Sequence, residues 1–155
     1  MKSIRDLVEE HEFFRGLEPP YLELIAGCGR NVHFRPGERI FREGEPADTF
    51  YVIREGKVAI EVNAPQRGPI LIETLGAGEV LGWSWLFPPY RWSFDARSLD
   101  ETRAVALDGA CLRGKCEDDS HLGYELMGRF ARIMQERLQA TRLQLLDVYG
   151  RDDRA

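Results

Sequence analysis

Residues 50–62 read FYVIREGKVAIEV, two short apolar runs separated by the polar stretch REGK. Apolar and polar side chains alternate along the second run, as they do in a strand that buries one face. The glycine lies where a tight turn favours a positive φ, a conformation that costs other residues about 1 kcal/mol. This stretch therefore predicts a β-hairpin in which Val58, Ile60 and Val62 point inward.

The same pattern of short apolar runs continues on both sides of this predicted hairpin. Short apolar runs punctuated by Gly and Pro fill residues 31–110, a pattern typical of a β-roll. Residues 1–30 instead contain two short amphipathic patterns, each ended by glycine, and predict a helical preface. Ser3, with Asp6 three residues later, is typical of the start of the first helix. Acidic and hydroxyl side chains at residues 118–120 provide capping oxygens for a long helix over 118–149. We expect one mainly β domain over residues 1–155, a double-stranded β-helix or jelly-roll barrel with flanking helices.

The predicted long helix carries two apolar stripes. The first contains Leu122, Leu126, Phe130 and Ile133. The second recurs at alternating steps of four and three, the spacing of a coiled-coil seam: Met127, Ala131, Met134, Leu138, Thr141, Leu145 and Val148. Thirty helical residues span about 45 Å, too long for one small roll to cover. We expect the first stripe to pack on the roll, and the second to meet the same helix of another copy in a homodimer. The alternative is that the whole helix lies on its own domain.

Composition and charge restrict the class of protein. The chain has 155 residues, 43% of them hydrophobic and 30% charged, with a formal net charge of −5. These values are typical of a globular protein and provide no overall field that attracts nucleic acid or anionic lipid. No apolar stretch is long enough to span a membrane, and we expect a cytoplasmic location. The odd set Cys28, Cys111 and Cys116 favours reduced thiols over a disulfide framework.

The order of preface, roll and long helix resembles the cyclic-nucleotide-binding domain of the catabolite-activator (Crp/Fnr) superfamily. Residues 34–48 are similar to the start of that family's barrel, and residues 50–58 are similar to its hairpin. Residues 75–79 read LGAGE, which looks like the family's lead-in to its ligand-binding segment. The resemblance implies a sensory or regulatory domain. Transcription factors of the superfamily place a helix-turn-helix domain after the long helix, and from the end at Ala155 we expect a stand-alone domain without direct DNA binding.

The ligand segment departs from the family pattern. The resemblance implies a Glu that receives the ribose hydroxyl and an Arg that clasps the cyclic phosphate. The matching positions hold Trp83 and Trp92, and Arg91 lies one residue early. An indole neither accepts from a hydroxyl as a carboxylate does nor neutralises a phosphate. We therefore expect that cyclic AMP or cyclic GMP is not held in the conventional way, and no cofactor is assigned.

An aromatic cluster replaces those charges: Trp83, Trp85, Phe87, Tyr90, Trp92 and Phe94. Three interpretations remain open: rings that plug the barrel, a pocket for a flat or apolar small molecule, and a cyclic nucleotide held in an unusual way. The candidate ligand-binding set is Gly82, Trp83, Ser84, Arg91, Trp92 and Ser93. Arg97 is a further candidate for an anionic ligand, or else a solvated strand residue.

Catalysis and metal binding have no support in the motifs. The three histidines are far apart, and no nucleophile–His arrangement, phosphate-binding loop or dinucleotide glycine pattern is present. We do not expect an enzyme. Our first hypothesis is a homodimeric sensor that binds a small molecule beside residues 82–93 and shifts its long helices. The dimer interface would contain Met127, Met134, Leu138, Thr141 and Leu145. The rival is a ligand-free module whose helix seam binds another, unidentified protein.

Overall fold

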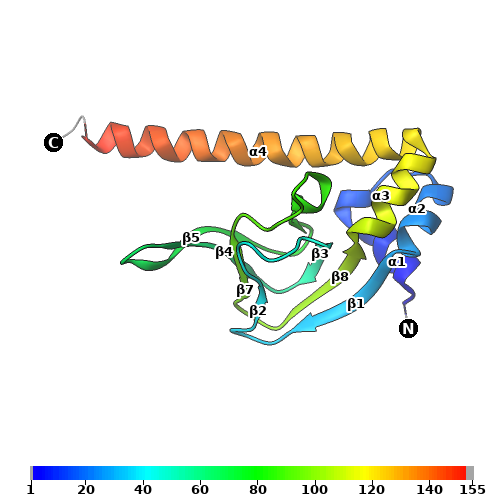
Figure 1. Cartoon of the computed structure of the whole chain (residues 1–155), viewed down its shortest axis with the longest axis horizontal. Helices are drawn as coiled ribbons and strands as arrows, with labels where there is room; N and C mark the ends of the chain where they lie inside the picture. Colours follow the sequence, from blue (N-terminus) through cyan, green and yellow to red (C-terminus); the bar gives the residue numbers. More distant parts are fainter. Residues whose placement is uncertain (1, 153–155) are drawn as a thin grey trace.

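Two four-stranded antiparallel sheets form the roll in the computed structural model, which describes residues 2–152 (Figure 1). The first sheet has the order β1-β8-β3-β6: β1 Gly29–Phe34, β8 Thr102–Asp108, β3 Thr49–Glu55 and β6 Val80–Leu81. The second has the order β2-β7-β4-β5: β2 Arg39–Phe41, β7 Asp95–Ser98, β4 Val58–Ala64 and β5 Gly68–Leu75. The mainly β fold with flanking helices is confirmed, although the two sheets do not close into one barrel within the described residues.

The stretch at residues 50–62 forms two strands, but they do not pair as a hairpin. Strand β3 pairs with β6 and β8, whereas β4 pairs with β5 and β7, so the turn at Gly56 carries the chain from one sheet to the other. Gly56 has φ +97°, and a Cβ there would lie 2.5 Å from the Oγ1 of Thr102. Val58 and Ile60 are buried as predicted, whereas Val62 is 36% exposed because β4 and β5 project beyond the roll (Figure 1).

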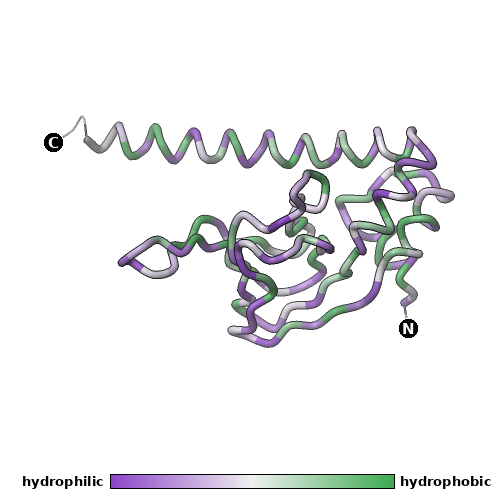
Figure 2. Tube along the Cα trace, viewed as in Figure 1, coloured by the Kyte–Doolittle hydropathy of each residue, from purple (hydrophilic) through white to green (hydrophobic). Residues whose placement is uncertain are grey.

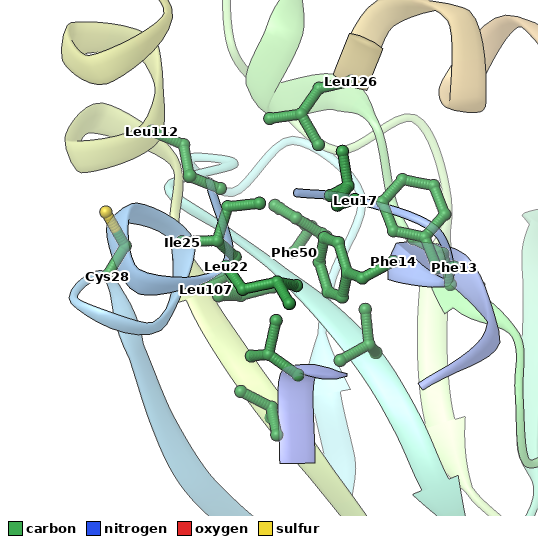
Figure 3. Close-up of a cluster of buried hydrophobic side chains, with 14 of the residues drawn as sticks. Phe13, Phe14, Leu17, Leu22, Ile25, Cys28, Phe50, Leu107, Leu112 and Leu126 are labelled. Atoms are coloured by element: carbon green, nitrogen blue, oxygen red, sulfur yellow. The ribbon is translucent and has the colours of Figure 1, made fainter. Parts of the chain in front are cut away.

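The helical preface consists of α1 Ile4–Glu10, the 3-10 turn η1 Glu12–Phe14 and α2 Pro19–Ala26. As predicted, Ser3 starts α1, through a reciprocal capping box with Asp6. Apolar side chains of the preface pack against the first sheet. Figure 3 shows Phe13, Phe14, Leu17, Leu22 and Ile25 gathered around Phe50 and Leu107 of the strands. The preface is thus part of the main hydrophobic core, not an appendage to the roll.

Two helices follow the roll where one was predicted: α3 Gly109–Asp118 and α4 Ser120–Asp152. They are separated at Asp119, whose carboxylate accepts from the backbone N–H groups of His121 and Leu122. The first predicted stripe is buried at Leu122, Leu126 and Phe130. Beyond it α4 continues over and past the roll (Figure 1). Hydrophobic residues recur along this distal part (Figure 2), and Leu138, Leu143, Leu145 and Leu146 are more than half exposed there. Within the described residues, no helix is both long and apolar enough to cross a membrane.

The expectation of three reduced thiols is wrong for two of them, because Cys28 and Cys111 form a disulfide. Strands β1 and β8 are antiparallel neighbours, with Gly29 opposite Leu107. Their pairing brings the segment before β1 next to the helix after β8, and the two cysteine Cα atoms lie 5.8 Å apart. Counting cysteines could not anticipate this, since the two residues are 83 positions apart in sequence. Cys116 is a free thiol.

Candidate functional site

The candidate ligand segment, residues 82–93, connects β6 to β7 across the end of the roll. It begins at Gly82, which has φ +95°, and contains the 3-10 turn η2 Ser84–Leu86. A cis peptide bond between Pro88 and Pro89 follows. Because the segment carries all three tryptophans and is only twelve residues long, the direction taken by each indole decides what the site can do.

Trp92 points into the roll. Only 4% of the residue is exposed, and its ring stacks on Phe41 of β2 with centroids 3.7 Å apart and an interplanar angle of 6°. A Cβ at position 82 would lie 2.4 Å from the Trp92 ring, so Gly82 allows the indole to approach the backbone. Two of the predicted site residues, Gly82 and Trp92, are thus in contact, and the indole occupies space between the two sheets.

Trp85 points the other way, into the core that the helices share with the first sheet. It is fully buried and stacks on Phe50 at 5.0 Å, while Phe130 of α4 meets its ring edge-on at 5.6 Å. Its indole Nε1 has no hydrogen-bond partner. An unpaired buried donor costs about 1–3 kcal/mol, so apolar packing rather than polar contact holds this ring.

Trp83 lies beneath α4, where Arg137 covers it. The Arg137 guanidinium carbon is 4.7 Å from the centroid of the Trp83 ring, and its Nη2 donates to the Val80 carbonyl at 2.7 Å. Its Nε lies 3.7 Å from a Glu73 carboxylate oxygen. The Arg137 side chain is 17% exposed, and burial lowers its pKa from the usual value while the nearby carboxylates oppose that change. Arg137 therefore connects α4 to the start of the ligand segment.

Sequence reasoning missed the role of Arg137. A signal was present, because Arg137 follows Phe130 and Ile133 at spacings of seven and four and so continues the buried stripe. An arginine at the end of an apolar stripe can pack its aliphatic chain on apolar surface while its guanidinium contacts carbonyl oxygens and aromatic rings.

A second arginine, from α3, holds the middle of the segment. The Arg113 guanidinium carbon is 4.2 Å from the centroid of the Tyr90 ring, and its Nη1 donates to the Trp85 carbonyl at 2.5 Å. Tyr90 has φ +55°, and its carbonyl accepts from Ala47 N–H at 2.7 Å. The ligand segment therefore makes a cation–π contact with each of the two C-terminal helices, and its backbone also accepts a hydrogen bond from Arg113 of α3.

The remaining polar candidates do not converge with the indoles. Arg91 and Ser93 are exposed on either side of buried Trp92, and Arg91 Nη1 donates to the Gly44 carbonyl at 2.8 Å. Ser84 is half-buried at the start of η2. Arg97 forms a two-point ion pair with Glu61, at 3.1 and 3.0 Å, which raises the pKa of Arg97. The structure thus splits the predicted set between the inside and the outside of the roll.

A cleft of about 850 Å³ lies between η1, the turn before β6 and α4. Its walls carry both signs of charge, including Arg15, Arg132, Glu12 and Glu136. Arg129 closes one side by donating to the Phe13 carbonyl at 2.7 Å. Beyond Phe130, α4 contacts the body of the domain through Ile133 and Met134, which pack partly on the core, and then through Arg137. Within residues 2–149, no group of three or more His, Cys, Asp or Glu side chains is placed to hold a metal ion.

Comparison with known proteins agrees with this architecture. Residues 31–119 match the family described as Cyclic nucleotide-binding domain, and the chain belongs to that family. It is 31% identical over 139 residues to the CRP-like cAMP-activated global transcriptional regulator of Mycobacterium tuberculosis. That alignment covers 90% of this chain and 60% of the regulator, so the chain spans less than two thirds of its relative's length. The resemblance to the Crp/Fnr superfamily is confirmed.

Solved structures support the same assignment. A putative cyclic nucleotide-binding protein from Geobacter metallireducens superposes with a TM-score of 0.78 at 30% identity, covering 89% of this chain and 99% of that one. A cyclic nucleotide-binding domain from Methylobacillus flagellatus has a TM-score of 0.77 at 18% identity, covering 92% and 80%, and shows the shared fold alone. The matched relatives are thus a transcriptional regulator and cyclic nucleotide-binding proteins.

Proposed function

We propose that this chain is a dimeric regulatory domain in which residues 82–93 receive a small ligand and α4 transmits the response. The contact of Arg137 with Trp83 and Val80 carries this proposal, because it joins the two elements directly. A ligand that moves Trp83 breaks a cation–π contact and changes how the distal part of α4 is held. Occupancy then favours one of two helix arrangements.

The ligand class follows from the side chains of the segment. Trp92 and Trp83 supply flat apolar rings, whereas Glu61 and Arg97 already neutralise one another on the strands. A flat or apolar molecule that stacks on Trp83 in place of Arg137, or that displaces the Trp92 ring from Phe41, fits better than a conventionally held cyclic nucleotide. Ser84 is the polar side chain next to Trp83, whereas Arg91 and Ser93 lie on the outside of the roll. Losing two charge-assisted contacts would weaken cyclic AMP or cyclic GMP binding by about 3–6 kcal/mol.

The dimer part of the proposal rests on the second stripe of α4. Leu138 is 51% exposed and Leu145 is 53% exposed, and Met127 and Val148 are similarly exposed. Apolar residues at coiled-coil spacing on an exposed helix face are suited to a second copy of the same helix. We assign Met127, Met134, Leu138, Thr141 and Leu145 to the interface; of these, Met134 also packs partly against the domain's own core. A cytoplasmic location and the absence of direct DNA binding by this domain remain part of the proposal.

A second candidate is a ligand-free dimeric scaffold. The stacking of Trp92 on Phe41 against Gly82 favours it, since the indole already fills space inside the roll. In that case α4 presents a constant surface to a protein partner.

Native mass spectrometry of the purified chain separates the two candidates. We expect a species of twice the 17.8 kDa chain mass that carries a small-molecule adduct, lost on denaturation. A bare dimer that also shows no heat with cyclic AMP or cyclic GMP in calorimetry would favour the scaffold. A monomer at micromolar concentration would overturn both.

Spin labels test the route through Arg137. Labels at Gln135, introduced as Q135C in a C116S background, report the distance between the two α4 helices. We expect Arg137→Gln to shift or broaden this distance, and Arg132→Gln, on the cleft side of the same helix, to leave it unchanged. Identical distances in both variants would show that Arg137 does not transmit the response to α4.

A further inference from the structure

The disulfide joins two segments that the fold already holds together. Asp108 N–H donates to the Cys28 carbonyl at 2.9 Å, at the end of the ladder between β1 and β8. The Asp108 carboxylate then accepts from Cys111 N–H at 2.8 Å and caps α3. These hydrogen bonds do not involve the sulfur atoms, so they can keep the two segments together while the pair opens and re-forms.

The helix that the bond restrains is the one that grips the ligand segment. Cys111 lies in the first turn of α3, two residues before Arg113, and α4 follows directly after α3. Lys115 Nζ donates to the Leu24 carbonyl at 2.5 Å, near the end of α2. The disulfide is thus the one covalent attachment of α3 to the segment after α2. Opening it leaves the Lys115 hydrogen bond, the Asp108–Cys28 backbone bond and the packing of Leu112 in the core to hold the helix.

The third cysteine does not compete for this pairing. Cys116 is five residues from Cys111, which places it about 140° further around α3. Burial, aided by the Asp119 carboxylate, raises the pKa of the Cys116 thiol, so little thiolate is available for exchange. Cys28 is 8% exposed and Cys111 is more accessible, so an exchange reagent reaches the bond from the Cys111 side.

We propose that Cys28–Cys111 is a reversible redox lock that fixes the first turn of α3 to the segment after α2 when oxidised and loosens that attachment when reduced. The oxidant is a low-molecular-weight disulfide. The Cys111 thiolate attacks one of its sulfur atoms and expels one thiol, and Cys28 then displaces the second thiol to close the protein bond. Two small thiols reverse the sequence. The effect on residues 82–93, through Arg113, rests on the proposed function, whereas the bond and the loosening of α3 do not.

Thiol counting on the full chain tests the chemistry. The chain is equilibrated in defined ratios of reduced to oxidised glutathione, quenched with acid, denatured and alkylated with a maleimide before intact-mass measurement. We expect one labelled cysteine under oxidising and three under reducing conditions, with zero and two in C116S. Three labels in every buffer would show that the bond does not form. One label even in a large excess of thiol would show a permanent structural bond.

Hydrogen exchange and thermal unfolding test the lock itself. On reduction, we expect the amides of residues 109–118 to exchange at least tenfold faster and the melting temperature to fall by about 5–15 °C. C116S should keep both responses, and the C28S/C111S pair should match the reduced protein and ignore reductant. Unchanged exchange in α3 would overturn the lock. The proposed function is tested separately, by the dimer mass and the ligand retention that native mass spectrometry measures.

Discussion

The two halves of α4 have the same secondary structure but different surroundings. In the first half, Leu122, Leu126 and Phe130 are fully or almost fully buried against the domain's own core. In the second half, Leu138, Leu143, Leu145 and Leu146 are all more than half exposed. The helix therefore stabilises the domain through one half and offers an apolar surface through the other. Arg137 lies at the boundary, where packing gives way to a single charged attachment.

The largest expected effect is on the buried half. Phe130→Ala removes a ring that contacts Phe13, Phe50 and Trp85. The change should lower the free energy of unfolding by about 3–5 kcal/mol, because it leaves a cavity among side chains that cannot collapse fully. Urea unfolding measures it. The matched control, Leu143→Ala in the exposed half, should change stability by less than about 0.5 kcal/mol. Equal losses in both variants would mean that the halves do not differ.

The next effect is on association through the exposed half. Leu138→Asp together with Leu145→Asp places charges on the proposed seam, and we expect the dimer dissociation constant to rise by about 100-fold or more. Sedimentation equilibrium measures the change. Leu143→Asp, on the same helix but outside the seam, is the control and should leave association near wild type. A dimer that survives the double change would place the interface elsewhere.

A smaller effect is expected at the boundary. Arg137→Ala removes the hydrogen bond to Val80 and the contact with Trp83, worth about 1–3 kcal/mol together. The loss should be local, so we expect faster hydrogen exchange in residues 134–149 with little change in residues 120–130. Arg137→Lys should restore exchange only partly, because an ammonium lacks the planar face that lies on the indole. Uniform exchange along α4 in the alanine variant would contradict this picture.

The smallest expected effect is the pH dependence of stability that arises from the buried residue His11. His11 Nε2 lies 2.9 Å from the Ile53 carbonyl, and its Nδ1 accepts from Phe13 N–H, so the folded protein holds a neutral ring. Burial lowers the pKa of His11 below its usual 6.5. At pH below about 6.5 the unfolded chain takes up a proton that the folded chain does not. The stability contribution of neutral His11 is therefore full above that pH and is lost as pH falls toward the lowered value.

Urea midpoints at pH 7.5 and 5.5 measure this dependence. His11→Gln should reduce the difference between the two midpoints. His33→Gln, at an exposed site, should leave the part of that difference that comes from His11 unchanged. An unchanged difference in His11→Gln would assign the pH dependence to other groups.

Much of the local structure followed from the sequence. Glycine turns, alternating apolar residues and the two helix stripes depend on neighbours within a few positions, so periodicity alone predicted the roll, the Ser3 cap and the burial of Leu122, Leu126 and Phe130. The short helix α3 was missed because its residues lack a clear apolar stripe. The sequence also identified the segment at residues 82–93 as unusual, since its tryptophans depart from the family pattern.

Only the tertiary structure decided which distant residues meet. Local pattern could not reveal that β3 and β4 belong to different sheets, because hydrogen-bond partners are chosen by the whole chain. It could not show that Trp92 turns into the roll while Trp83 turns toward Arg137, or that Cys28 meets Cys111 across 83 positions. Such contacts depend on long-range packing. Sequence periodicity specifies which face of an element is apolar, but the assembled fold determines what that face touches.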